Sequence, residues 1–152
     1  MKIEESIQQK KFSSSFHKAQ VNVLYTAAWM SHQSAQALRP FNISVQQFNI
    51  LRILRGMHPE TATVKLLTER MIDKMSNASR LVEKLKQKEL VERQDCPEDR
   101  RRVNISITEA GLQLLEEASE ALNQQTLSQM EYLSEEEAKV LSDLLDRIRT
   151  DE

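Results

Sequence analysis

The sequence is poor in the residues that interrupt helices and in the residue that cross-links chains. Its 152 residues include two glycines, three prolines and one cysteine. So few helix breakers predict long helices, and a single cysteine excludes an internal disulfide framework and fits a reducing compartment. No apolar run approaches the roughly 18 residues that a bilayer span requires, and the first residues lack the apolar core of a signal peptide. The sequence therefore predicts a cytoplasmic, helical protein.

Patterns typical of catalysis are missing as well. The sequence has no glycine-rich phosphate loop, no paired-carboxylate motif and no nucleophile with a neighbouring base. Its three histidines, His17, His32 and His58, are isolated and lack metal-ligand spacing. We therefore expect no enzymatic activity, no metal and no cofactor. A small-molecule sensor with an unrecognised enzyme site is the least supported alternative.

The net charge of −2 is distributed unevenly along the chain. Residues 1–60 hold seven Lys/Arg and three Asp/Glu, residues 61–102 hold eleven and eight, and residues 103–152 hold three and twelve. Because attraction to phosphate depends on local charge, a basic middle and an acidic end are compatible with nucleic-acid binding. The acidic end is interpreted as solvated helix surface.

Hydrophobic periodicity predicts about six helices. Residues 16–38 contain no glycine or proline and carry two adjacent apolar stripes, the pattern of a long helix. Later helices are expected to begin at these positions: Ser44, Thr61 or Thr63, residues 74–76, Thr108 and Ser134. Ser134 and Glu137 have the spacing of a capping box. The polar residues 1–15 are expected to fray or to pack on a partner.

The helix expected near residues 76–88 has one apolar and one polar face. Its apolar residues recur at three- and four-residue steps and must face the core, which places five polar residues together on or beside the other face: Ser76, Asn77, Ser79, Arg80 and Lys84. Asn and Arg bond bidentately to adenine and guanine, and Ser and Lys reach phosphates or bases. The pattern favours a helix that enters the major groove of DNA, although an ordinary solvated face would look the same.

A basic hairpin follows this helix. Residues 90–93 and 103–107 have strand patterns, and the polar residues 94–102 form the tip. The tip carries three consecutive cations: Arg100, Arg101 and Arg102. Adjacent guanidinium groups repel one another, so an anion is the expected partner, and arginine is favoured in the minor groove. Asp99 is expected to hold one guanidinium through a charge-assisted hydrogen bond; a solubilising loop is the alternative for the tip.

The order and spacing of these blocks resemble the winged helix-turn-helix of the multiple-antibiotic-resistance regulator (MarR) family. The matching blocks are LTERM at 67–71, SNASRLVEKL at 76–85, LVER at 90–93, DRR at 99–101 and ITEAG at 107–111. The resemblance implies a mainly α fold with a small β wing. It also implies that residues 43–108 form a DNA-binding lobe, and that residues 1–42 and 109–152 together form a helical dimerisation lobe.

The resemblance further implies a bacterial transcriptional regulator, a ligand- or signal-responsive repressor that binds a pseudo-palindromic operator in double-stranded DNA as a homodimer. Residues 76–84 become the recognition helix. Arg101, in an Asp-x-Arg pattern with Asp99, becomes the minor-groove finger, and Arg100 and Arg102 become backbone contacts. Three residues at a helix N-terminus are also expected to meet phosphate: Ser44, Gln46 and Gln47.

In the family, the first helix lines a ligand cleft. The resemblance therefore implies a small-molecule effector, aromatic or anionic, near four residues: Trp29, His32, Gln36 and Arg39. Ordinary packing of these residues is the alternative. Cys96 lies in the wing, whereas peroxide-sensing members are expected to carry a cysteine near the first helix, so an incidental thiol is favoured over a redox switch.

One position departs from the family pattern. Many relatives have glycine just before the LVER strand, where this chain has Glu89. If the backbone there needs a positive φ, glutamate costs about 1 kcal/mol. A different reading of the whole chain also remains open. The acidic end and low net charge fit a winged-helix protein-interaction module that does not read DNA.

Overall fold

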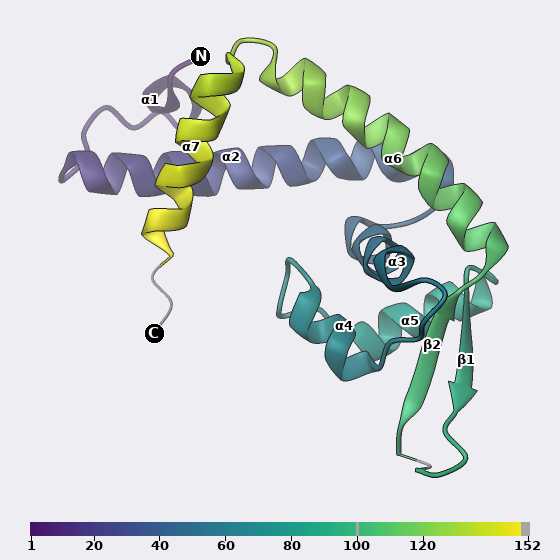
Figure 1. Cartoon of the computed structure of the whole chain (residues 1–152). Helices are drawn as coiled ribbons and strands as arrows, with labels where there is room; N and C mark the ends of the chain where they lie inside the picture. Colours follow the sequence, from purple (N-terminus) through teal and green to yellow (C-terminus); the bar gives the residue numbers. More distant parts are fainter. Residues whose placement is uncertain (100, 150–152) are drawn as a thin grey trace. The chain divides into compact units, whose positions relative to one another are not determined.

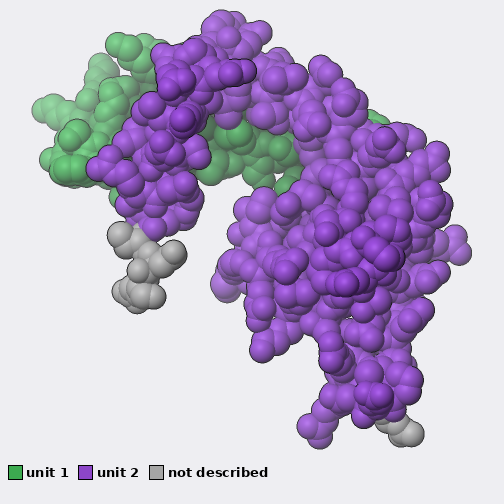
Figure 2. All heavy atoms as spheres, viewed as in Figure 1, with its two compact units in different colours: residues 1–45 green, residues 46–152 purple. Residues whose placement is uncertain are grey.

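The structure is a computed structural model that describes residues 1–99 and 101–149. The described chain is mainly helical with one two-stranded antiparallel sheet (Figure 1), which confirms the predicted fold class. It divides into two compact units, residues 1–45 and 46–152 (Figure 2), called here the N-terminal and C-terminal units. The division into dimerisation and DNA-binding segments stays a prediction. Arg100, one of the predicted DNA contacts, lies outside the described residues.

The N-terminal unit is built on one long helix. Its elements are α1 (Ile3–Ser6), α2 (Ser15–Leu38) and the 3-10 helix η1 (Arg39–Phe41). The predicted helix over residues 16–38 is confirmed, and the Ser14 hydroxyl caps it by accepting from the His17 amide at 3.1 Å. Residues 3–6, within the segment expected to fray or to pack on a partner, form α1. Its Glu4 pairs with Lys18 of α2, and this hydrogen bond holds the pKa of the Glu4 carboxyl below its ordinary value.

The C-terminal unit contains a compact helical core and a wing. Its elements are α3 (Val45–Met57), α4 (Val64–Arg70), α5 (Ala78–Gln87), β1 (Val91–Asp95), β2 (Val103–Ile107), α6 (Glu109–Met130) and α7 (Glu135–Ile148). Each element from α3 to α6 contributes at least one buried apolar side chain, at positions that the periodicity predicted. Fully buried examples are Leu51, Leu54, Leu67, Leu85, Ile105 and Leu115.

The turn before α5 is longer than predicted. The sequence placed the start of this helix at residues 74–76, but α5 begins at Ala78. Asp73 explains the difference, because its carboxylate accepts from the Met75 amide at 3.0 Å and its carbonyl accepts from the Ser76 amide at 3.2 Å. These bonds hold residues 73–76 in a turn, and the helix starts only after Asn77 can cap it.

The wing is anchored to the helical core through β2. Val91 pairs with Ile107 at its base, and Asp95 pairs with Val103 towards the tip. On its other edge, Ile105 exchanges two backbone hydrogen bonds of 2.8 Å with Ala62, the segment that leads into α4. Because β2 is bonded on both edges and Ile105 is fully buried, the base of the wing is fixed relative to α4.

The connection from α5 through β1 to α6 is closely packed. Glu89 stands where many relatives have glycine, and its φ of 60° shows that the backbone there adopts the left-handed conformation. Thr108 caps α6 by accepting from the Gly111 amide at 3.0 Å, and its own amide donates to the Leu90 carbonyl at 3.1 Å. A Cβ on Gly111 would collide with the Leu90 carbonyl oxygen, so glycine is required at this approach.

Helix α7 carries an apolar face that its own chain does not bury. The predicted capping box is confirmed, and the hydrogen bonds from Ser134 hold the pKa of the Glu137 carboxyl below its ordinary value. None of the described α7 residues is buried, and four large apolar side chains are exposed: Val140, Leu141, Leu144 and Ile148. Among the described helices, none is long and apolar enough to cross a membrane.

Candidate nucleic-acid interface

The exposed face of α5 presents the side chains that the sequence singled out. Ser79, Arg80 and Lys84 are exposed, while Ala78, Val82 and Leu85 are buried on the opposite side. The prediction of two contrasting faces is therefore confirmed. The first helical turn, which in helix-turn-helix proteins reaches deepest into a groove, carries Ser79 and Arg80.

Asn77 and Ser76, two of the predicted DNA contacts, have local environments that the sequence did not predict. Asn77 is the N-cap of α5, and its carboxamide oxygen accepts from the Arg80 amide at 3.1 Å. The Ser76 hydroxyl is buried and has no hydrogen-bond partner within the described part of the chain. Asn77 therefore has a structural task besides any contact with a ligand, and Ser76 presents little of its oxygen to solvent.

The wing tip is ordered by backbone hydrogen bonds around Asp99. The Asp99 carboxylate accepts from the Arg101 amide at 3.0 Å, and its carbonyl accepts from the Arg102 amide at 2.9 Å. The Cys96 amide donates to the Arg102 carbonyl at 3.0 Å and closes the loop. We expected Asp99 to hold a guanidinium; among the described residues it instead holds the backbone, and Arg101 and Arg102 are exposed.

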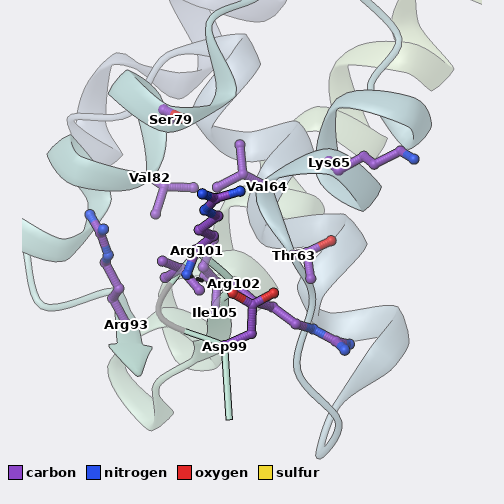
Figure 3. Close-up of a pocket in the computed structure, with 11 residues that line it drawn as sticks. Thr63, Val64, Lys65, Ser79, Val82, Arg93, Asp99, Arg101, Arg102 and Ile105 are labelled. Carbon is purple, nitrogen blue, oxygen red and sulfur yellow. Dashed lines mark hydrogen bonds between the residues drawn. The ribbon is translucent and has the colours of Figure 1, made fainter. Parts of the chain in front are cut away.

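A groove of about 470 Å³ lies between α4, α5 and the wing. In Figure 3, the Arg101 side chain extends toward Val64 at the start of α4, and Arg102 extends away from it. The lining includes four cations and one carboxylate: Lys65, Arg93, Arg101, Arg102 and Asp99. Ser79 of α5 lies on the same groove. The structure thus brings Ser79 and the tip arginines Arg101 and Arg102 to one basic groove, whereas Arg80 and Lys84 are not among its lining residues.

Two lining cations, Arg93 and Lys65, were not among the predicted site residues. Arg93 Nη1 lies 3.8 Å from Glu83 Oε2, so the pair links β1 to α5. Both side chains are about half exposed, and such pairs contribute little to stability. The alternation of side chains along β1 places Arg93 on the same face as buried Val91, which is the signal that would have identified it.

The phosphate contacts predicted at the N-terminus of α3 lie outside the groove between α5 and the wing. Ser44 is exposed and Gln46 is half-buried, but Gln47 is buried and its carboxamide oxygen accepts from Lys88 Nζ at 3.5 Å. None of the three lines the groove between α5 and the wing. A buried side chain that is hydrogen-bonded within its own chain is poorly placed to contact phosphate. The structure therefore does not support Gln47 as a phosphate contact.

The predicted effector residues share one face of the N-terminal unit. Trp29, His32 and Gln36 follow helical spacing on α2, and the first residue of η1 is Arg39. Gln36 Nε2 lies 2.9 Å from His32 Nε2, so these two side chains are brought together. Trp29, His32, Gln36 and Arg39 are all exposed. Within the described residues, no group of three or more His, Cys, Asp or Glu side chains is arranged to hold a metal ion.

A helix-turn-helix followed by a two-stranded wing defines a winged-helix protein. The family model described as MarR family matches residues 43–103. The crystal structure of a MarR transcription factor from Planctomyces limnophilus is 31% identical, with a TM-score of 0.70, and the match covers 90% of this chain and 98% of that one. The chain belongs to the MarR family of transcriptional regulators.

More distant structures show the same fold. The organohalide-sensing RdhR-CbdbA1625 regulator, solved with 2,4-dichlorophenol bound, is 21% identical with a TM-score of 0.82, over 93% of this chain and 85% of that one. BpsR of Bordetella bronchiseptica, whose DNA binding is regulated by 6-hydroxynicotinic acid, is 21% identical with a TM-score of 0.69, over 84% and 98%. No curated protein sequence matches this chain significantly.

Proposed function

We propose that this protein is a sequence-specific DNA-binding regulator of transcription that acts as a repressor. The observation that carries the proposal is the basic groove, because Ser79 of α5 and the arginine tip of the wing border the same space. A helix and a ribbon in this arrangement suit the major groove and the adjacent minor groove of one duplex. The net charge of −2 does not oppose this, since the acidic residues concentrate beyond residue 102.

The side chains divide by the part of DNA that they would contact. Base edges are assigned to Asn77, Ser79 and Arg80, since Asn and Arg form bidentate bonds with adenine and guanine. Arg101 is assigned to the minor groove. Phosphates are assigned to Lys84, Arg100, Arg102, Ser44 and Gln46. The exposed positions of Ser79, Arg80 and Lys84 on α5 support their part of this assignment.

We propose that the DNA-binding form is a homodimer. The exposed apolar face of α7 supports this, since four large apolar residues on a well-capped helix are exposed in their own chain. A two-fold dimer presents two copies of α5, so the operator is a pseudo-palindrome with half-sites about 10 base pairs apart.

We propose that an aromatic or anionic small molecule regulates the dimer. The support comes from two relatives, one bound to 2,4-dichlorophenol and one regulated by 6-hydroxynicotinic acid. The residues assigned to it are Trp29, His32, Gln36 and Arg39. The aromatic ring of Trp29 and the guanidinium of Arg39 suit an aromatic acid.

A salt titration tests DNA binding directly. Purified protein is bound to duplexes selected from random sequence, and the association constant is measured at increasing salt. We expect its logarithm to fall linearly with the logarithm of salt concentration, with a slope of about −0.9 per phosphate contacted. Scrambled duplexes should bind more weakly. Failure to bind any duplex at low salt would favour a protein-interaction module instead.

A further inference from the structure

Two large apolar side chains project from the turn between α4 and α5. Ile72 is 82% exposed and Met75 is 92% exposed. No other large apolar side chain is exposed within the described part of residues 43–108. Their neighbour Met71 is 1% exposed and fills the core. A single exposed apolar residue needs no explanation, but a pair in the turn directly before α5 suggests a contact with a partner.

The turn holds these side chains outward on an ordered backbone. The Asp73 carboxylate accepts from the Met75 amide, as described above, and Lys74 Nζ bonds to the Glu69 carbonyl at the end of α4. Asn77, only two residues after Met75, caps α5. Met75 is therefore fixed next to the first turn of the helix that carries Ser79 and Arg80.

The surroundings of the pair suit a base edge better than an apolar partner. Asp73 and Lys74 lie between the two apolar residues in sequence, and Arg70 and Arg80 on either side of the turn are exposed. An apolar protein surface would desolvate these charged groups, whereas a DNA groove offers phosphates to the three cations beside its bases. In the major groove, thymine is the ordinary base that presents a methyl group.

We propose that Ile72 and Met75 are specificity residues that contact the C5 methyl group of a thymine, beside the bases read by Ser79 and Arg80. This inference rests on the proposed function, because it requires α5 to enter the major groove. It adds an apolar contact to a site whose other assigned contacts are polar. Its consequence is a preference for thymine at one position of each half-site, set by the turn rather than by the helix.

Deoxyuridine tests the proposal because it differs from thymidine only by the missing methyl group. Each thymine of a duplex selected by the wild-type protein is replaced in turn, and affinities are measured for the wild type, Ile72→Ala, Met75→Ala and Met75→Leu. We expect one replacement per half-site to weaken wild-type binding about fourfold, the ratio that corresponds to about 0.8 kcal/mol for one buried methyl-sized group. Met75→Ala or Ile72→Ala should remove that loss, and the apolar Met75→Leu should retain it.

The outcomes separate this inference from the proposed function. If the wild type binds the selected duplex but shows the same uracil effects as Met75→Ala and Ile72→Ala, the thymine contact is refuted and DNA binding stands. If the wild type binds no duplex, both ideas fall. Thermal unfolding of each variant serves as the folding control, and the midpoints should match the wild type because the altered side chains are exposed.

Discussion

The Thr108 hydroxyl donates a hydrogen bond of 2.8 Å to the carbonyl oxygen of Glu89. The Thr108 hydroxyl oxygen also accepts from the Gly111 amide, so one side chain both caps α6 and ties its first turn to the end of α5. Glu89 sits in the left-handed region at this junction, with a φ of 60°. The junction therefore keeps a strained residue in place through a contact with a later helix.

Replacement of Glu89 by glycine should stabilise the protein. A left-handed conformation costs a residue with a Cβ roughly 1–2 kcal/mol, and part of this gain is offset because glycine is more flexible in the unfolded chain. We expect Glu89→Gly to raise the free energy of unfolding by about 0.5–1 kcal/mol in chemical denaturation. The matched control is Glu92→Gly within β1, which should destabilise, because glycine weakens a strand interior.

Replacement of Gly111 by alanine should strongly destabilise the protein. The added Cβ would collide with the Leu90 carbonyl oxygen and lie 2.7 Å from Ile107 Cγ1, and neither backbone nor core atom can yield easily. Overpacking of this kind costs about 1–3 kcal/mol. Gly56→Ala is the control, since nothing lies within 4 Å of its Cβ position and alanine favours the helix. Equal unfolding midpoints for the two variants would contradict the close approach.

Asn77 should show two separable roles. Asn77→Ala removes the cap of α5 and should cost about 0.5–2 kcal/mol of stability. Asn77→Ser keeps a capping oxygen and should preserve stability, yet it removes the carboxamide that suits adenine. We therefore expect both variants to change base preference in a randomised operator library, with a loss of stability only for alanine. An unchanged preference in Asn77→Ser would restrict Asn77 to its structural role.

The two described arginines of the wing tip should differ in their effect on DNA binding. Arg101→Ala should weaken binding by about 1–3 kcal/mol if it enters the minor groove. Arg102→Ala should weaken binding evenly across sequences and reduce the magnitude of the salt slope by about one, as expected for a phosphate contact. Lys139→Ala on the polar face of α7 removes one positive charge outside the proposed DNA interface and controls for net charge. Affinity at moderate salt, measured by fluorescence anisotropy, checks all three.

A charge on the apolar face of α7 should disrupt the homodimer. Leu144 is exposed in the single chain, so Leu144→Glu leaves the monomer undisturbed but places a carboxylate in the proposed interface. Such a group loses its water of hydration without gaining a partner. We therefore expect the dissociation constant of the dimer to rise at least tenfold, which corresponds to about 1.4 kcal/mol. Sedimentation equilibrium measures the change. Lys139→Glu, on the polar face of the same helix, should leave the dimer intact.

Local patterns predicted the wing and the two faces of α5, because hydrophobic periodicity determines which side of an element is buried, as at Ile105. The strain at Glu89 was also visible, as a departure from glycine. The start of α5 was not, since the Asp73 turn competes with the helix over a few residues. Gln47 is buried and accepts a hydrogen bond from Lys88, which lies 41 residues away in sequence, and no local pattern predicts such a contact.

The uncovered face of α7 also has a thermodynamic consequence. An isolated helix of about 12–15 residues is only marginally stable in water, and α7 has 14 residues with none buried in its own chain. Its helicity must therefore come from whatever covers it. If a second copy does so, folding of α7 becomes bimolecular and follows mass action. Dilution would then unfold α7 before the winged helix-turn-helix, so the helical content of the chain would depend on its concentration.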